Sequence, residues 1–351
     1  MKMKLHRRYL GSLAFSAGGF DTLRLPRNYV YSALKFCLIA DIDRAGGAAG
    51  DAKDSAPAQL VNTLEVVVNG KNTVKRMDME TLHRRNQQYH GVRPFIDAAN
   101  LAGFGVLAND ISMVSAQFDF ELPPAGPWAK GVDCLLDARG MSSLDLNVRW
   151  GTGLDVMNDA FGGAITVNSA RLHVWTIERV NAPVVPYALW KEYRLLSQTV
   201  PGAGILTFDL PVNTTYEAVT LKTHSDGDQV NTIIPWGAAN QNPIRLYSGS
   251  EVYLDLPGGA IQMDNRLALQ TEVPELTLSA AAINHARQEF RLEGYYHLPF
   301  VHDGMLSEML DATRLGDLKI DATCAVPGTQ DVVDIYCSEI ILPETPAQAA
   351  A

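Results

Sequence analysis

Histidine is the residue type in this chain most suited to binding a metal ion, and the eight histidines are poorly spaced for it. A metal centre on facing strands needs three or four ligands that converge within about 2.2 Å of the ion. No H-x-H pair occurs, and the closest late pair is His297 and His302. We expect a structural or surface role for His297 and a solvated helix face for His83 and His90. The sequence therefore predicts no histidine metal centre.

Two aspartates, Asp226 and Asp228, form a weak candidate for a calcium site in the segment HSDGDQV. Calcium loops alternate oxygen ligands around a turn-forming glycine, and this segment has such an arrangement. The further ligands and the closing glutamate of a calcium loop are missing. We therefore predict no cofactor, with a structural calcium ion at Asp226 and Asp228 as the open alternative.

No arrangement of nucleophile and base stands out, so we predict that the chain is not an enzyme. The nucleophile motif G-x-S-x-G is absent, and the glycine groups lack the strand-to-helix context of a phosphate loop. Asp133 and Asp137 are acids that could meet in space, but spacing alone does not pair them. The cysteines are scattered and form no C-x-x-C pair, which indicates buried free thiols. They are Cys37, Cys134, Cys324 and Cys337.

The composition argues against some classes of partner. A net charge of −10 is unsuited to coating nucleic acid, which requires dense lysine and arginine. Charged residues make up 19% of the chain, below the ~25% typical of globular proteins. Surfaces covered by neighbouring subunits would explain this, because interface centres are poor in charge. A loop-rich all-β protein would explain it equally well. No stretch reaches the ~18 apolar residues of a membrane span.

Basic residues gather at the start of the chain, namely Lys2, Lys4, Arg7 and Arg8. The apolar run that follows is short and is broken by glycines, which is unlike a signal peptide. A basic arm that touches an anionic surface is one interpretation, and a disordered tail is the other.

Strict alternation of apolar and polar residues recurs along the chain and predicts strands with one solvated face. The clearest segments are 117–122, 144–150, 290–298 and 318–324. Helices are expected only as short inserts, over 93–103 and around residue 283. The fold class is therefore all-β.

A repeat divides the chain in two. TLRLPRNYVYSALKF at 22–36 and TFDLPVNTTYEAVTL at 207–221 agree at six of fifteen positions. Further pairs follow in the same order, as a duplication requires. They are Leu122-Pro123 with Leu298-Pro299, Leu136-Asp137-Ala138 with Leu310-Asp311-Ala312, and Leu144 with Leu318.

Each half has the length of a jelly roll, a sandwich of two four-stranded sheets. We predict two tandem eight-stranded jelly-roll sandwiches, a double jelly roll, with short helical inserts. The expected division is a basic N-terminal arm at 1–18, a first jelly roll at 19–181, a linker at 182–200, a second jelly roll at 201–344 and a C-terminal tail at 345–351.

With these paired segments and its basic start, the chain resembles the double jelly-roll major capsid proteins of tailless, membrane-containing icosahedral bacteriophages, the corticovirus, tectivirus and autolykivirus lineage. The resemblance covers nearly the whole chain. It implies a homotrimer whose six jelly rolls form a pseudo-hexameric capsomer. It also implies that Lys2, Lys4, Arg7 and Arg8 lie against an internal lipid membrane.

The leading hypothesis is thus a structural coat protein of an icosahedral virion, made in the host cytoplasm and incorporated into the capsid shell. Its partners would be copies of itself and the other capsid, penton and membrane proteins of the virion, with no direct contact to nucleic acid. One alternative is a carbohydrate-binding or glycan-cleaving double jelly-roll protein. The other is a minor spike or vertex protein of the same kind of virion.

Overall fold

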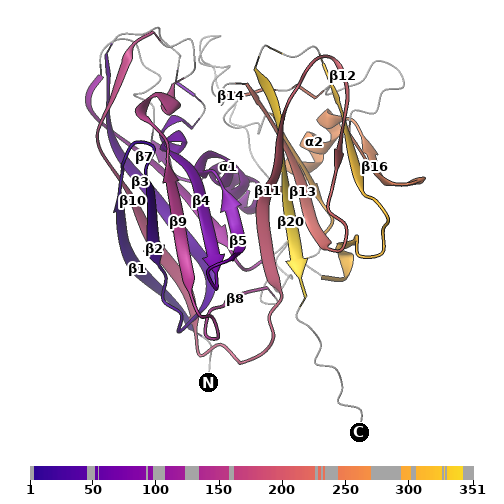
Figure 1. Ribbon diagram of the computed structural model, residues 1–351, viewed down its shortest axis with the longest axis horizontal. Coiled ribbons are helices and arrows are strands. Elements are labelled where there is room, and N and C mark those ends of the chain that lie inside the picture. Colours follow the sequence, from indigo (N-terminus) through magenta and orange to yellow (C-terminus); the bar gives the residue numbers. More distant parts are fainter. Residues whose placement is uncertain are drawn as a thin grey trace.

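The computed structural model describes residues 4–45, 52–53, 55–91, 94–97, 107–122, 134–157, 162–225, 228–230, 232–233, 244–269, 294–301, 306–325, 328 and 330–342. Within these residues the chain forms two β units side by side, with their strands upright (Figure 1). Among the described helices none has the length and apolarity needed to cross a membrane.

The first unit consists of two antiparallel sheets. One has the order β1-β10-β3-β7, with short β6 beside β7 and β8 beside β3, and the other has the order β2-β9-β4-β5. Its elements are β1 (Lys4–Ala14), β2 (Phe20–Arg24), β3 (Val30–Ala45), 3-10 turn η1 (Ala56–Leu60), β4 (Val61–Val68), β5 (Asn72–Met77), α1 (Met79–His90), β6 (Ile96–Asp97), β7 (Leu107–Asp119), β8 (Leu136–Asp137), β9 (Leu144–Trp150), η3 (Gly153–Val156) and β10 (Ala164–Val180).

The second unit repeats this plan. Its sheets have the orders β11-β20-β13-β17, with β14 and β18 beside β13, and β12-β19-β15-β16. Its elements are β11 (Leu189–Thr199), β12 (Gly204–Asp209), β13 (Thr215–Ser225), β14 (Asp228–Gln229), β15 (Ile244–Ser248), β16 (Glu251–Leu256), α2 (Gly258–Leu269), β17 (Tyr295–Pro299), η4 (Leu306–Glu308), β18 (Leu310–Asp311), β19 (Lys319–Cys324) and β20 (Asp331–Ile341).

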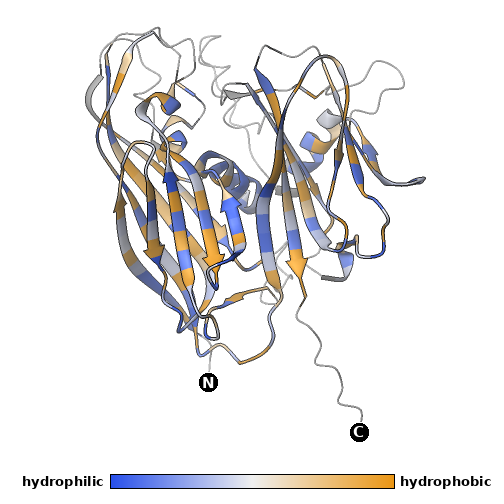
Figure 2. Ribbon diagram, in the orientation of Figure 1, coloured by the Kyte–Doolittle hydropathy of each residue, from blue (hydrophilic) through white to orange (hydrophobic). Residues whose placement is uncertain are grey.

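Alternation along the strands accounts for the two cores. In β9 every second residue from Leu144 to Trp150 is buried, and β3 and β4 follow the same period of two. Figure 2 shows the resulting alternation of hydrophobic and hydrophilic colours along the upright strands. The apolar residues of each unit pack into a separate cluster, with Phe36 edge-on to Phe118 at 5.6 Å between ring centroids in the first. Each unit therefore has its own hydrophobic core.

The repeated segments form the same corner in both units. The Tyr31 hydroxyl donates a hydrogen bond to the Pro26 carbonyl, and the Tyr216 hydroxyl donates to the Pro211 carbonyl at 2.5 Å. Both tyrosines are fully buried, so each hydroxyl needs this acceptor. The residues shared by the two sequence segments thus fix the entry of β3 and β13.

The later sequence pairs meet at that corner. The Leu25 amide donates to the Leu144 carbonyl at 2.8 Å, and the Leu210 amide donates to the Leu318 carbonyl at the same distance. The pairing of Leu144 with Leu318 is therefore confirmed. The pairing of FELPP with YHLPF is wrong: Phe118 of β7 and Leu298 of β17 occupy equivalent places, opposite Leu34 and Val219.

Two segments differ from the predicted division of the chain. The predicted arm contains β1, which pairs along its length with β10, and the predicted linker contains β11, which pairs with β20. By this pairing β1 belongs to the first unit and β11 to the second. Their backbone groups find ladder partners at sheet edges, a long-range outcome that local pattern does not show. The other boundaries stay predictions.

The predicted helices also need correction. Ile96 and Asp97 form β6 instead of the helix expected over 93–103, and the other residues of that range are largely outside the described part, as is the helix expected around residue 283. The two longer helices lie elsewhere. Each follows the outer strand of a hairpin: α1 follows β5 and α2 follows β16.

Candidate functional site

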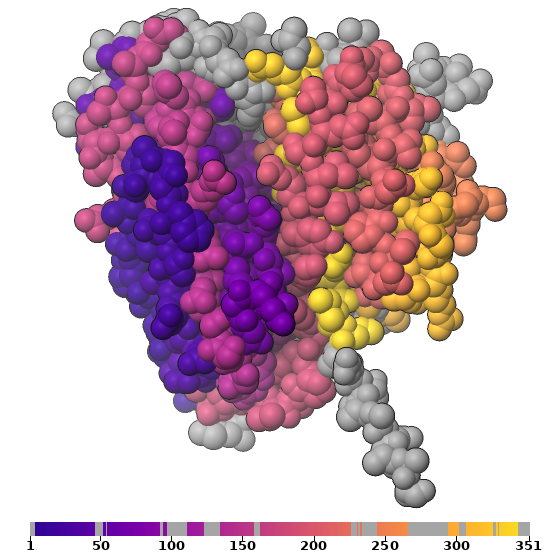
Figure 3. Space-filling view, viewed as in Figure 1, coloured from indigo at the N-terminus to yellow at the C-terminus, as the bar shows by residue number. Residues whose placement is uncertain are grey.

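The two units share one sheet. Strand β11 of the second unit pairs in parallel with β5 of the first, with Glu192 opposite Lys75 and Tyr193 opposite Arg76. This pairing joins four strands of the first unit and six of the second into a continuous ten-stranded sheet. In the space-filling view of Figure 3 the units meet closely along this seam, which runs down the middle of the visible face.

Helix α1 lies behind the seam, between the units (Figure 1). Its start is fixed by Asp78, whose carboxylate accepts the Thr81 amide at 2.7 Å, and its end by Gly91 in the left-handed region. Toward the first unit, the Asn86 side chain exchanges two hydrogen bonds with the backbone of Gln117 on β7. The helix thereby satisfies backbone groups at a strand edge. From Met79 to Gln88 every residue is buried, although the segment METLHRRNQQ is mostly polar.

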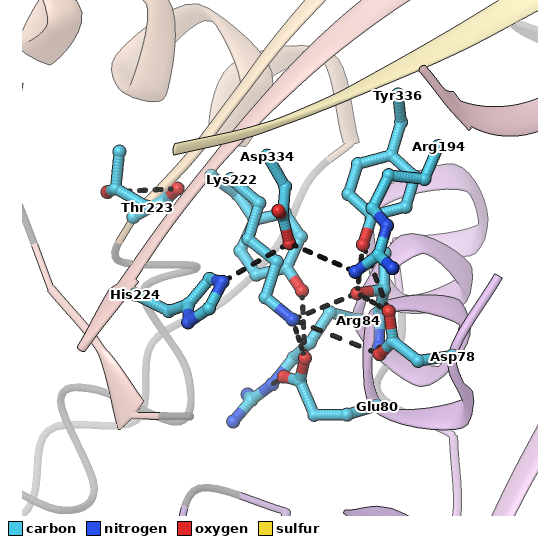
Figure 4. Close-up of polar contacts among 12 residues, drawn as sticks. Asp78, Glu80, Arg84, Arg194, Lys222, Thr223, His224, Asp334 and Tyr336 are labelled. Carbon is cyan, nitrogen blue, oxygen red and sulfur yellow. Dashed lines mark hydrogen bonds and ion pairs between the residues drawn. The ribbon is translucent and has the colours of Figure 1, made fainter. Parts of the chain in front are cut away.

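Toward the second unit, α1 presents acids to a buried lysine (Figure 4). Lys222 of β13 donates hydrogen bonds to Glu80 and, at 2.9 Å, to the Thr81 hydroxyl. The Tyr295 hydroxyl of β17 donates to the same Glu80 carboxylate at 3.2 Å. Burial opposes the charged form of Lys222, but the carboxylates around it raise its pKa well above the usual value. These contacts link the first unit's helix to two strands of the second.

Asp78 extends this network. It accepts a hydrogen bond from Tyr336 of β20 at 2.9 Å and lies 3.9 Å from the Lys222 ammonium. Burial raises the pKa of Asp78, but the Lys222 charge and the hydrogen bonds from Thr81 and Tyr336 outweigh it and lower that pKa. One carboxylate therefore caps α1 and also binds the second unit.

A second ionic group forms where β5 meets β11. The fully buried Glu192 carboxylate pairs with Lys75 at 2.5 Å and also with Arg85 of α1. The Lys75 ammonium lies 3.9 Å from the centroid of the Trp190 ring, over which the Arg85 guanidinium also lies. Burial, and then the nearby Arg85 charge, lower the pKa of Lys75. One acid thus holds two buried cations from the other unit.

The seam also has a basic outer side. A groove of about 510 Å³ lies beside β5 and β11 and is lined by polar and apolar residues, the aliphatic ones being Val74, Leu189 and Ile341. Its cations are Lys71, Arg76, Lys191 and Arg194. Arg194 also lies 3.8 Å from Asp334, which His224 contacts at 3.2 Å (Figure 4).

Buried ion pairs of this kind fix the relative orientation of the two units more than they add to the free energy of unfolding. Buried ion pairs add little net stability, because desolvation offsets their attraction, but each one is strongly destabilised when a partner is missing. The geometry around α1 therefore tolerates one arrangement of the units. This constraint is mechanical.

Neither a family model nor a curated protein matches the sequence. Solved structures do match. One match is the STIV MCP, from Sulfolobus turreted icosahedral virus. The match covers 99% of this chain and 100% of the STIV chain, with a TM-score of 0.70 and 17% sequence identity. The major capsid protein P2 from bacteriophage PM2 covers 97% and 99%, with a TM-score of 0.58 and 11% identity. The PBCV-1 virus capsid chain covers 97% and 94%, with a TM-score of 0.59 and 10% identity.

The fold is a double jelly roll. Each unit has eight main strands in two sheets, as the sequence predicted.

Within the double jelly roll the predicted basic residues lie on β1, except Lys2, which is outside the described residues. Lys4 and Arg7 are exposed. Arg8 turns inward, with its guanidinium 4.3 Å from the Tyr29 ring centroid and 3.5 Å from the buried Glu178 carboxylate. A hydrogen bond with Tyr29 raises the pKa of Arg8. Lys4, Arg7 and Arg8 are therefore part of a paired strand, not of a free arm.

The solvated helix face predicted for His83 and His90 needs correction, whereas His297 has a structural role, one of the two roles expected. His83 is fully buried and donates to the Ser115 carbonyl at 2.8 Å, so its part of α1 is not solvated. His90, at the end of the helix, is exposed and contacts Asp119 at 3.0 Å. His297 is buried, 2.8 Å from the Thr220 hydroxyl and edge-on to the Tyr89 ring. Burial, and then the Arg85 charge, lower the pKa of His297 to about 3. It is a neutral structural histidine.

The calcium prediction remains untested, because Asp226 and the side chain of Asp228 are outside the described residues. Within the described residues no group of three or more His, Cys, Asp or Glu side chains is arranged to hold a metal ion. The four cysteines are free thiols; three are buried and Cys37 is half-buried.

Sequence reasoning missed the residues of the seam: Lys75, Asp78, Glu80, Arg85, Glu192, Lys222 and Tyr336. One local signal was available. Asp78 at a helix start, Thr81 three residues on and Gly91 at the end form a capped helix pattern. No local pattern shows that this helix is buried, because its partners come from the other half of the chain.

Proposed function

We propose that the chain is the major coat subunit of a tailless icosahedral virion, with an architectural role and no catalysis. The observation that supports this most is the correspondence of both units at once. The match to the STIV MCP spans 99% of this chain and 100% of that one, so it includes both units of this chain. Jelly rolls also occur in lectins, so the fold by itself does not decide function.

The coat role also suits the duplication. Two like units in each chain let three copies present six similar units around a threefold axis, the pseudo-hexameric capsomer. The partners we propose are copies of the chain and the other capsid, penton and membrane proteins of the virion. A contact between the basic N-terminal residues and an internal membrane stays a prediction, as does structural calcium.

Light scattering coupled to size-exclusion chromatography tests this proposal. We expect a particle of about three times the 38.3 kDa of one chain, seen by negative-stain imaging as a hexagonal plate. A single chain that binds glycans on an array would contradict it and would favour the carbohydrate-binding alternative. Copy number per particle separates a major coat subunit from a minor spike or vertex protein.

A further inference from the structure

The seam is formed by β11 of the second unit and β5 of the first. Each of these strands has a counterpart in the other unit, β1 and β16 respectively, and neither counterpart takes part in the seam. Within the described residues, β11 is paired on both sides, by β20 and β5, whereas its counterpart β1 is paired only by β10. Likewise β5 is paired by β4 and β11, whereas its counterpart β16 is paired only by β15. Among the edge strands of the described residues, β1 and β16 are thus the two whose counterparts form the seam, and they lie at opposite flanks of the molecule (Figure 1).

Register shifts in the β-ladders show which residues of β1 and β11 are counterparts. The register of β1 against β10 shifts between Tyr9 and Gly11, and that of β11 against β20 shifts between Arg194 and Leu196. These shifts stand at the same places along the two strands. Position by position, Arg7 of β1 is then the counterpart of Glu192 in β11.

The hairpins β4-β5 and β15-β16 align in the same way. Their registers shift between Val66 and Val67 and between Leu246 and Tyr247, opposite Lys75 and Leu254 respectively. Lys75 and Leu254 are thus counterparts. Helices α1 and α2 start at the same distance after these strands, and each has 12 residues. Asp264 is therefore the counterpart of Arg85.

We propose that β1 of one copy pairs in parallel with β16 of a second copy, beneath its helix α2, as β11 pairs with β5 beneath α1. The contact rests on the proposed function, because a coat trimer requires a head-to-tail contact between copies. A contact of this kind joins different surfaces and closes into a ring when the rotation permits.

Charge complementarity supports this occupant. Inside the chain, the acid Glu192 on β11 meets the base Arg85 on the helix. At the open edges the signs are exchanged: Arg7 on β1 is a base and Asp264 on α2 is an acid, and both are exposed. A copy of this chain therefore meets an open edge with opposite charge.

Apolar side chains support it as well. Leu5 on β1 is 63% exposed, whereas its counterpart Trp190 is 1% exposed. Inside the chain Trp190 lies against the Lys75 stem and ammonium; between copies Leu5 would lie against Leu254. On α2, Met263 is 53% exposed, and its counterpart Arg84 is fully buried. Large apolar side chains thus stand exposed at places that the seam buries.

This assignment gives Arg7 a role different from lipid contact. Reversing its charge in Arg7→Asp places two acids at each contact between copies, and Asp264→Arg places two bases there. We expect each single variant to elute as one chain at concentrations at which the wild type is trimeric. The double variant Arg7→Asp/Asp264→Arg restores opposite charges, and we expect it to recover the trimer. Arg149→Asp, on an exposed position of β9, is the matched control and stays trimeric.

Disulfide trapping gives a second readout that does not depend on the charge variants. Arg7→Cys/Leu254→Cys, in a Cys37→Ser background, places thiols on residues expected to face each other across copies. Facing strand residues lie within disulfide range. We expect oxidation to give a ladder on a non-reducing gel that ends at three chains, with no ladder for Arg7→Cys alone.

The outcomes separate this inference from the proposed function. A wild-type trimer that withstands both charge reversals and forms no cross-link overturns the β1–β16 contact and leaves the coat proposal standing. A wild-type chain that remains single at every concentration overturns the coat proposal itself.

Discussion

Helices α1 and α2 occupy the same place in the two units, yet their surroundings are opposite. The segment METLHRRNQQYH of α1 is polar and buried, while GGAIQMDNRLAL of α2 is more apolar and exposes Met263 and Asp264. The corner made by Tyr31 and Tyr216 is meanwhile the same in both units. Equivalent segments of the two units therefore adopt the same backbone structure. Whether their side chains are buried depends on which part of the molecule lies next to them.

The largest expected loss of stability comes from removing a buried ion pair at the seam, next to α1. Glu192→Ala leaves the Lys75 and Arg85 charges buried without their acid, which costs about 3–5 kcal/mol of unfolding free energy. Urea denaturation of dilute, unassembled chains measures it. The control is Arg7→Ala, the counterpart on the open strand, for which we expect a change of about 0.5 kcal/mol or less. Equal losses in the two variants would show that the seam and the open edge do not differ.

A pH series tests the burial of His297 at the same seam. The unfolded chain protonates this histidine near its ordinary pKa of about 6.5, and the folded chain only near 3, so the unfolded state binds more protons between these values. Stability then falls as pH falls through this window, by up to about 1.4 kcal/mol per pH unit from this residue. We expect His297→Gln to flatten the slope of unfolding free energy against pH by that amount. An unchanged slope would mean that the side chain reaches solvent.

The smallest expected losses of stability come from the corner that both units share, where a tyrosine hydroxyl binds a proline carbonyl. Tyr31→Phe and Tyr216→Phe each remove one buried hydrogen bond to a proline carbonyl, which costs about 1 kcal/mol. We expect the two losses to agree within about 0.5 kcal/mol, and to add in the double variant because the sites are separate. Thermal unfolding of the three variants measures this. A loss confined to one unit would show that the corners are not equivalent.

The double jelly roll was predictable because its evidence is local. Strands such as β9 alternate residue by residue, and the Pro26–Tyr31 and Pro211–Tyr216 segments repeat with the same spacing. Strand β1 was not predictable in this way, since Lys4, His6, Arg7 and Arg8 interrupt the alternation. Its place in a sheet depends on β10, at the far end of the unit.

The seam was harder still. Lys222 and Glu80 lie far apart in the sequence, as do Lys75 and Glu192, and each side chain alone reads as an ordinary surface charge. Only the meeting of the two units desolvates them. The four-residue error in pairing FELPP with YHLPF has a similar origin, because a shared Leu-Pro does not fix strand register.

Each unit begins with a strand whose partner in the sheet is the last strand of that unit, and this order determines when the unit can be completed during synthesis. Lys4 pairs with Val180, so the β1 ladder is complete only when about half of the chain has been synthesised. At about 5–20 residues per second this wait is on the order of ten seconds. Strand β11 can pair with β5 as soon as it is made, but its other partner, β20, is the last of the described strands. The open β1 edge is therefore finished about halfway through synthesis, whereas the second unit is completed only when β20 has been made.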